Sequence, residues 1–253
     1  MRIGVIGAGP IGRTLIRQYA LAGHDIKMAN ANDAEKLKKL EAETGAKAVT
    51  LEHIAVDIDV LVVSVPLVAI PELAKSLGKS IPADTVVIDT TNYYPIRDGV
   101  IDEIEEGIIE SVWVANHLGH PVVKAYNSIL AGSLLESGLP EGNPDRIALS
   151  ISGNDEQAKS LVATLINDSG FDTMDAGNLE GSWRQQPGSP VYCTDLNLAQ
   201  LKKNIFKANR EVLPERRELS LQFIIKQDPE QWMVWWKNCV TNNRSIFECN
   251  LIA

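Results

Sequence analysis

The sequence predicts an α/β fold built on a doubly wound parallel sheet, followed by a smaller and mainly helical carboxyl-terminal part. Short apolar runs alternate with helical segments, the pattern G-x-G-x-x-G begins at residue 7, and helical patterns dominate after residue 195. Strands that alternate with helices form a parallel sheet with helices on both faces.

The amino-terminal half shows the alternation most clearly. Apolar runs predict buried parallel strands at residues 3–6, 25–29, 60–63 and 86–88. Helical spacing predicts helices at residues 14–21 and 34–43 and through Leu73 and Leu77, with Gly23 as the cap of the first helix.

The alternation continues past residue 100 and then changes. We expect helices at residues 108–118 and 155–167, and strands at residues 122–126, 146–151 and 171–174. Residues 178–194 are rich in Gly, Pro, Ser and Gln and predict a loop that crosses the molecule. Beyond it, Pro214 and Asp228 mark the starts of two helices.

The first apolar run ends in the segment 7–12, whose sequence GAGPIG matches G-x-G-x-x-G. The first glycine permits a tight turn, the second lets backbone approach a pyrophosphate, and the third allows close packing of helix on sheet. The helix amino terminus then offers free N–H groups to the phosphates. The alternative is a glycine turn that only packs tightly. The candidate cofactor-binding residues here are Gly7, Gly9, Pro10, Ile11 and Gly12.

These observations divide the chain into two expected parts. Residues 1–177 are expected to form a Rossmann-like dinucleotide-binding domain, and residues 178–253 the crossing loop and a carboxyl-terminal helical segment.

The stretch KMANANDAEK, residues 27–36, follows the second predicted strand, where the adenine ribose is bound in such folds. No carboxylate stands at positions 30–32 to bind the ribose hydroxyls of NAD. Asn30 and Asn32 can donate to a phosphate and Lys36 lies nearby, so the sequence favours NADP(H) over NAD. Asp33 is as well suited to capping the next helix.

Composition and charge exclude several classes of function. The net charge of −9 makes bulk attraction to nucleic acid or anionic membrane unexpected. Cys193, Cys239 and Cys249 lack paired spacing and a histidine cluster, which favours free thiols over a zinc site or disulfides. No segment at the amino terminus resembles a signal peptide and no apolar run is long enough to cross a bilayer, so the expected location is the cytoplasm.

The charge is unevenly distributed along the chain. Residues 1–194 carry 15 basic and 26 acidic side chains, whereas residues 195–253 carry 9 basic and 7 acidic ones. Chance variation in solvated surfaces is one explanation.

Four segments together resemble the NADP-dependent oxidoreductases of the deazaflavin coenzyme F420. They are the glycine motif, Ser64-Val65-Pro66-Leu67, residues 123–129 with the sequence VKAYNSI, and residues 174–179 with the sequence MDAGNL. Similar folds occur in bacterial relatives of unknown substrate and in the cytosolic reductase domain of the STEAP metalloreductases. The resemblance spans about residues 1–190.

The resemblance implies direct hydride transfer between NADP(H) and a second planar ring, coenzyme F420 or a flavin. Such chemistry needs two rings held face to face with water excluded, and little from protein acids or bases. No catalytic acid, base or metal ligand is therefore expected. His24, His53, His117 and His120 are scattered along the chain, which fits surface or packing roles.

By position, residues after three of the strands would line the cofactor pocket. Ser64, Val65 and Pro66 would form a loop over the dinucleotide, whereas Thr91, Asn92 and Asn127 would lie near the nicotinamide. Simpler roles are open for two of them: Pro66 as the start of a helix and Asn92 as part of an Asx turn.

Residues 180–188, with the sequence EGSWRQQPG, are the expected wall for the second substrate. Trp183 could stack on a flat ring and Arg184 could pair with an acidic tail. Equally, Trp183 could fill the core between domains and Arg184 could form a surface ion pair.

Two features depart from the family pattern. The arginine that relatives commonly carry after the second strand is replaced, with Asn32 in its neighbourhood. The carboxyl-terminal helices also extend beyond the compact form of the family, and Trp232, Trp235 and Trp236 share one helical face there. Such a stripe indicates core or an interface more than a ligand site, and a homodimer through these helices would cover it.

Two other functions fit parts of the sequence. A dehydrogenase for a small alcohol or hydroxy acid would need a proton donor in the cleft, and Lys124, on a predicted strand, is the candidate. A non-catalytic protein that binds NADP(H) to control association with a partner would suit the tryptophan stripe.

Overall fold

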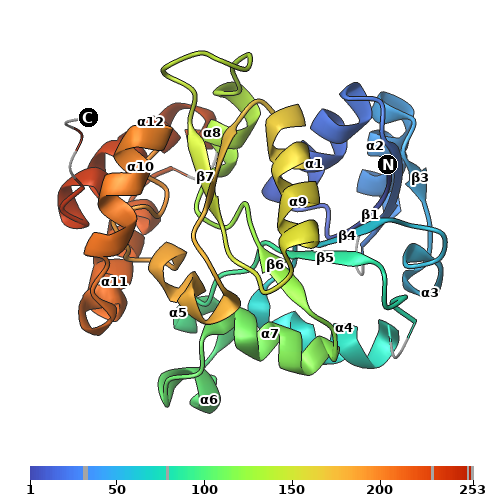
Figure 1. Ribbon diagram of the computed structural model, residues 1–253, viewed down its shortest axis with the longest axis horizontal. Helices are drawn as coiled ribbons and strands as arrows, with labels where there is room; N and C mark the ends of the chain where they lie inside the picture. Colours follow the sequence, from blue (N-terminus) through green and yellow to red (C-terminus); the bar gives the residue numbers. More distant parts are fainter. Residues whose placement is uncertain (31–33, 78–79, 229–230, 250, 252–253) are drawn as a thin grey trace.

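The computed structural model describes residues 1–30, 34–77, 80–228, 231–249 and 251. The side chains of residues 34, 36 and 232–234 lie outside this description. In Figure 1 the amino-terminal strands lie on the right of the view and helices α10–α12 lie on the left.

A six-stranded parallel sheet forms the centre of the fold, as expected. Its strands stand in the order β3-β2-β1-β4-β5-β6. They are β1 (Arg2–Ile6), β2 (Asp25–Ala29), β3 (Lys47–Ala48), β4 (Val60–Val63), β5 (Val86–Asp89) and β6 (Val122–Lys124). The order reverses between β1 and β4, and ligands of doubly wound sheets bind in the crevice at such a point.

Side chains alternate between two apolar cores, one on each face of the sheet. Val60 and Val62 pack into the first core, whereas Leu61 and Val63 pack into the second. Both faces of the strands are covered, which explains their continuous apolar runs.

Helices connect the strands and cover the sheet. Those of the first part are α1 (Pro10–Leu21), α2 (Ala34–Thr44), α3 (Leu51–Ile54), α4 (Ile70–Leu77), α5 (Pro95–Asp98), α6 (Asp102–Glu105), α7 (Glu110–Leu118), α8 (Ala131–Glu136) and α9 (Glu156–Asp168). Those after residue 190 are α10 (Leu198–Asn204), α11 (Leu213–Ile225) and α12 (Trp232–Ile246). Short 3-10 turns are η1 (Leu67–Ala69), η2 (Leu179–Gln185), η3 (Ile205–Lys207) and η4 (Arg210–Val212).

Several predicted boundaries were wrong, and three of them have a clear cause. The first helix begins at Pro10 rather than residue 14, because its glycine-rich first turn carries no helical signal of its own. The helix expected from residue 108 begins at Glu110, since Ile109 has an extended backbone. The strand expected to reach residue 126 ends at Lys124, and Tyr126 adopts a positive φ of 57°.

A second, two-stranded parallel sheet follows β6. It pairs β7 (Ala148–Ile151) with β8 (Asp172–Asp175), and an antiparallel bridge between Lys124 and Ser152 ties it to β6. Ala148 and Met174 of this sheet share an apolar cluster with Leu196, Leu201 and Ile205. The cluster therefore joins residues from both of the parts that were expected to meet at residue 177.

The carboxyl-terminal helices pack on the rest of the chain through Trp236. This side chain is 6% exposed, and the glycine at position 132 in α8 admits its ring, since a Cβ there would clash with it. Trp235 is partly exposed and its Nε1 donates to the Asp228 carbonyl at 2.7 Å. Trp236 is therefore core, whereas the side chain of Trp232 lies outside the described residues.

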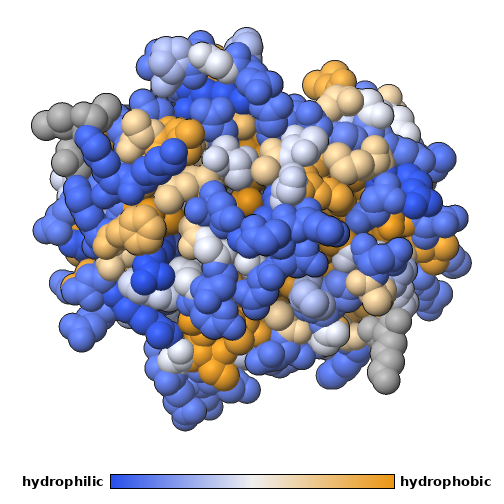
Figure 2. All heavy atoms as spheres, viewed as in Figure 1, coloured by the Kyte–Doolittle hydropathy of each residue, from blue (hydrophilic) through white to orange (hydrophobic). Residues whose placement is uncertain are grey.

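Hydrophilic residues cover most of the face seen in Figure 2, and hydrophobic ones gather low in the view, where α5 to α7 lie. Ile96, Val100 and Ile108 from this part of the chain are exposed. Among the residues that the structure describes, no helix is long and apolar enough to span a membrane.

Candidate functional site

The predicted site residues follow the carboxyl ends of neighbouring strands. Ile6 is paired with Ala29 on one side and Val63 on the other, Val63 with Asp89, and Asp89 with Lys124. Because these five strands end level with one another, the residues that follow them lie along a single edge of the sheet.

The glycine loop opens on this edge. Gly7 has a φ of 99°, and a Cβ there would clash with the Ser64 carbonyl. A Cβ at Gly12 would clash in the same way with the Gly7 carbonyl. Around Gly9, in contrast, a Cβ would meet no described atom within 4 Å. Gly7 and Gly12 therefore keep the turn and helix α1 tight, and Gly9 faces open space.

Helix α1 presents its amino terminus to the same opening. Gly9 is the N-cap residue and supplies no side-chain hydrogen bond, and Pro10 stands in the first turn. The first N–H groups of a helix have no intrahelical acceptor and attract anions. Ile11 is partly buried against the first apolar core, which fixes the helix under the loop. The loop therefore fits a pyrophosphate.

The position expected to set the cofactor preference is only partly described. Asn30 follows β2 directly and is partly exposed at the sheet edge. Asn32 and the side chain of Lys36 lie outside the described residues.

The segment after β4 borders the glycine loop. Ser64 N donates to the Ile6 carbonyl at 2.9 Å, which holds the segment beside β1. Ser64 and Val65 are partly buried and Pro66 is exposed. Pro66 is also the N-cap residue of η1. It therefore starts a short helix, as the simpler interpretation expected, and also lies in the segment that borders the glycine loop.

A buried ion pair fixes the segment after β5. Lys124 Nζ donates to Asp89 Oδ2 at 3.0 Å and to the Thr91 carbonyl, and both charged side chains are fully buried. Asp89 also accepts from Ser111 Oγ at 2.8 Å and from Thr91 N at 2.8 Å. Lys124 is thus enclosed and bonded, which does not suit a proton donor to a substrate. Asp89 and Ser111 are site residues that the sequence did not reveal.

Two predicted pocket residues, Asn92 and Asn127, contact each other directly. Asn92 Nδ2 donates to the Asn127 carbonyl at 2.9 Å, and Asn127 Nδ2 donates to Asn92 Oδ1 at 3.0 Å. Gln185 joins them: its Nε2 donates to Asn127 Oδ1 at 2.9 Å, and its carbonyl accepts from Asn127 Nδ2 at 2.7 Å. Thr91 is buried beside this group, and its Oγ1 has no partner in the described part of the chain.

Gln185 was missed because it stands in a polar stretch that predicts only a loop. It is fully buried, and its Oε1 accepts from Ser152 Oγ at 3.0 Å. The crossing segment therefore reaches the sheet edge through Gln185.

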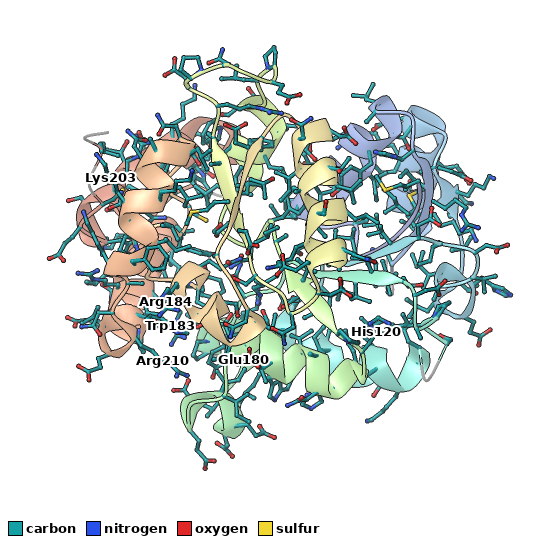
Figure 3. All side chains as sticks on the ribbon, viewed as in Figure 1. His120, Glu180, Trp183, Arg184, Lys203 and Arg210 are labelled. Atoms are coloured by element: carbon teal, nitrogen blue, oxygen red, sulfur yellow. The ribbon has the colours of Figure 1, made fainter. Side chains whose placement is uncertain are left out.

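Trp183 and Arg184 lie two and one residues before it, on η2, where Figure 3 labels them side by side. The Arg184 guanidinium carbon lies 4.5 Å from the centre of the Trp183 ring, so the cation stacks on the indole. Both side chains are partly exposed. Neither is a core plug of the kind Trp236 provides, and no ion pair of Arg184 occurs within the described ranges.

Glu110, at the start of α7, is the carboxyl group most affected by burial. It is 4% exposed, and its Oε2 accepts from Tyr93 N at 3.1 Å. Burial raises the pKa of Glu110 to about 7, although nearby Lys124 and the bond from Tyr93 oppose the shift. The sequence carried no signal for this group.

Replacing Glu110 with glutamine is expected to stabilise the protein by about 3 kcal/mol near pH 8 and by far less near pH 5. The folded pKa of about 7 exceeds the ordinary 4.5. The folded state therefore binds more protons between those values, and stability falls as pH rises through this window. Glutamine stays neutral and its Oε1 can still accept from Tyr93. Urea unfolding at both pH values measures the difference.

The exposed neighbour Glu106 supplies the control, since Glu106→Gln should change stability little at either pH. Equal effects of Glu110→Gln at the two pH values would contradict the pKa of about 7.

No group of three or more His, Cys, Asp and Glu side chains that could hold a metal ion occurs among the described residues. Cys193 and Cys239 are buried free thiols, and burial raises the pKa of each.

Two sequence matches each cover a part of the chain. Residues 2–93 match the family model described as NADP oxidoreductase, coenzyme F420-dependent. Over 63 residues the chain is 43% identical to the Escherichia coli K12 protein YjhV. That match covers 25% of this chain and 46% of YjhV, so it spans less than half of the curated relative.

Solved structures extend the likeness over most of the fold. A hypothetical protein from Sinorhizobium meliloti, SMa0349, is 27% identical with a TM-score of 0.68, over 78% of this chain and 95% of that one. A candidate F420-dependent NADP reductase from Arthrobacter sp. FB24 is 22% identical with a TM-score of 0.59, over 70% and 85% of the two chains. At 22% identity, the likeness to the Arthrobacter protein shows a shared fold and no more.

Proposed function

We propose that this chain, whose residues 2–93 match the model of the coenzyme F420-dependent NADP oxidoreductases, exchanges hydride between NADP(H) and a second planar redox cofactor. The second cofactor is coenzyme F420 or a flavin. The observation that carries the proposal is the arrangement at the sheet edge. The open glycine loop, Asn92 and Asn127 follow strands that end level, and Gln185 of the crossing segment is bonded to Asn127 there.

The residues present fit a dinucleotide along this edge. The open side of Gly9 and the uncapped start of α1 would receive the pyrophosphate. Asn30, with Asn32 and Lys36, would bind the adenine ribose and its phosphate. The nicotinamide end would meet Ser64, Val65, Pro66, Thr91, Asn92 and Asn127. Bound NADPH supplies the hydride.

The task of the protein in this chemistry is positioning. Hydride moves without a protein acid or base, so rate depends on the two rings being held together with water excluded. The amide of Asn127 is held from two sides, by Asn92 and by Gln185. The orphan hydroxyl of Thr91 is a buried polar atom available to a ligand.

Trp183 and Arg184 are proposed to bind the second cofactor. The indole offers a flat face, and the partly exposed guanidinium offers a charge for an acidic tail. Because Arg184 now stacks on Trp183, a ring that used this face would replace the guanidinium there.

Anaerobic mixing with NADPH and coenzyme F420 tests the proposal through the visible absorbance of the deazaflavin. Bleaching at a rate proportional to protein concentration is expected. Flavin mononucleotide in place of F420 tests the other acceptor, and Asn127→Ala should slow either reaction at least about tenfold. Tight NADPH binding without turnover of either acceptor would favour the NADP(H)-binding, non-catalytic alternative. Turnover of a hydroxy acid alone would favour a dehydrogenase.

NADPH is expected to bind more tightly than NADH. The ratio of the two affinities should be smaller than in a protein that binds the phosphate with an arginine. Asn30 and Asn32 are neutral donors, and charged donors bind phosphate more strongly. Fluorescence titration with both nucleotides measures the ratio. Asn30→Asp should reverse it, because a carboxylate binds the ribose hydroxyls of NADH and repels the phosphate. Equal affinities in the wild-type protein would contradict the proposed preference.

We further propose a cytoplasmic protein that forms a homodimer through its carboxyl-terminal helices. Leu219 and Ile225 of α11 are exposed apolar side chains on that part of the molecule. Trp236 is already covered within the chain and adds nothing to such an interface. Light scattering on the purified protein gives the assembly state.

A further inference from the structure

A cavity of about 240 Å³ lies where the carboxyl-terminal extension meets the sheet domain. One wall comes from residues 93–110, and the other from residues 210–217 of η4 and α11, with the crossing segment between them. Arg210, labelled in Figure 3, lines one side, and its Nη2 donates to the Gly107 carbonyl at 2.5 Å. None of the proposed dinucleotide-binding residues lines this cavity.

Glu110 is the most buried carboxyl group that lines the cavity. One oxygen, Oε2, accepts from Tyr93 N. The other, Oε1, has no hydrogen-bond partner in the part of the chain that the structure describes. When Glu110 is protonated, its hydroxyl can donate to a ligand.

Two further donors line the cavity with unused capacity. Arg217 lies over the Tyr93 ring, 5.3 Å from its centre, and its side chain is 11% exposed. Its Nε donates to Glu218, whereas its terminal amino groups have no acceptor among the described residues. Gln186 Nε2 is buried and also lacks an acceptor within the described ranges. Unpaired buried donors cost free energy that a ligand oxygen recovers.

The unpartnered donors around Glu110 favour a ligand that accepts hydrogen bonds, and the charges of the lining offset one another. Arg217 and Arg210 line the cavity, and Lys124 lies behind Glu110 with its charge paired to Asp89. Among the acidic groups, Glu105 accepts from the Tyr93 hydroxyl at 2.9 Å, and Glu211 is an exposed residue of η4. Tyr94 also faces Glu110, and burial keeps its phenol neutral by raising its pKa. With Glu110 neutral, the two arginines offset Glu105 and Glu211, and the buried unpartnered groups, Arg217 and Gln186 Nε2, are donors.

We propose that this cavity binds a small carboxylate ligand, held by Arg217 and Gln186, and that binding is coupled to protonation of Glu110. The proton comes from solvent and goes to Oε1, which then donates to the ligand oxygen. The cavity volume equals roughly eight waters at ~30 Å³ each, which limits the ligand to a small organic acid. The site is separate from the dinucleotide edge, so it stands whether or not the chain transfers hydride.

Propionate and propylammonium, matched in size and opposite in charge, are the probes. Calorimetric titration of the protein is expected to show propionate binding and no propylammonium binding. Because the pKa of Glu110 is about 7, propionate affinity should fall about tenfold from about pH 6 to about pH 8. Near pH 7, titrations in two buffers of different ionisation enthalpy should show uptake of about half a proton.

Neighbouring arginines provide a matched pair of variants. Arg217→Gln should weaken propionate binding at least about tenfold. Arg216→Gln removes the same charge from the same helix, but Arg216 pairs with Glu248 and does not line the cavity, so affinity should not change. Thermal unfolding confirms that both variants are folded. Glu110→Gln should keep binding, through its amide N–H, and lose the pH dependence.

Three results would overturn the proposal: tighter binding of propylammonium, pH-independent binding of propionate by the wild-type protein, or equal losses in the two arginine variants. Should Arg217→Gln fail to fold, Gln186→Leu serves in its place, with an expected loss of several-fold.

Discussion

Replacing Gly9 with alanine is expected to weaken NADPH binding at least about tenfold while leaving stability within about 1 kcal/mol of wild type. Gly9 has a φ of −67°, which alanine adopts freely, and an added Cβ would meet no described atom within 4 Å. The new methyl group would instead occupy the space through which backbone approaches the pyrophosphate. Titration with NADPH and urea unfolding measure the two quantities separately.

Gly12→Ala is the counterpart, with a different expected pattern. Its Cβ would clash with the Gly7 carbonyl, so the loop and helix α1 must move apart. A loss of about 1–3 kcal/mol of stability is expected, together with a loss of NADPH binding. Full NADPH affinity in Gly9→Ala would place the dinucleotide away from this loop. A stable Gly12→Ala would contradict the steric role of Gly12.

Lys124→Met is expected to lower the free energy of unfolding by about 3–5 kcal/mol. The substitution leaves Asp89 with a buried charge and no cation, although Ser111 and Thr91 still donate to it. The double variant Asp89→Asn with Lys124→Met removes both charges and should recover a large part of the loss. Urea unfolding of the two single variants and the double variant gives the coupling energy.

The control for this cycle is Arg2 with Asp59, an exposed pair whose N–O distance is 2.6 Å. Arg2→Met should cost far less stability than Lys124→Met, because exposed ion pairs contribute little. If the stability losses of the two single variants simply add up in the double variant, Lys124 and Asp89 are not coupled. Asp89 would then be stabilised by Ser111 and Thr91 alone. That result would also weaken the view that Lys124 fixes the segment after β5.

Much of the fold was predictable because apolar runs and glycines determine it locally. Residues 60–63 were predicted with their observed bounds because this strand is continuously apolar and buried, and residues 25–29 because their apolar side chains lie between the helix that ends before Gly23 and the next helix. The need for glycine at positions 7 and 12 was predictable from the motif. A side chain there would clash with the backbone of Ser64 or of Gly7, and the strand–turn–helix geometry brings these segments close together.

Features that depend on contacts distant in sequence were not predictable. Gln185 stands in a loop-like stretch and becomes a buried residue only because Asn127 and Ser152 meet it there. The early end of β6 depends on its bridge to Ser152, 28 positions later in the chain. Burial of Glu110 depends in turn on α11, which lies more than a hundred residues away.

The junction between the sheet domain and α11 has a consequence for how this protein can diverge. The family match ends at residue 93, whereas Arg210 and Arg217 lie far beyond it. Substitutions in α11 can therefore change the chemistry of the cavity without altering the glycine loop. The ligand preference of the cavity can then change while the glycine loop keeps its geometry.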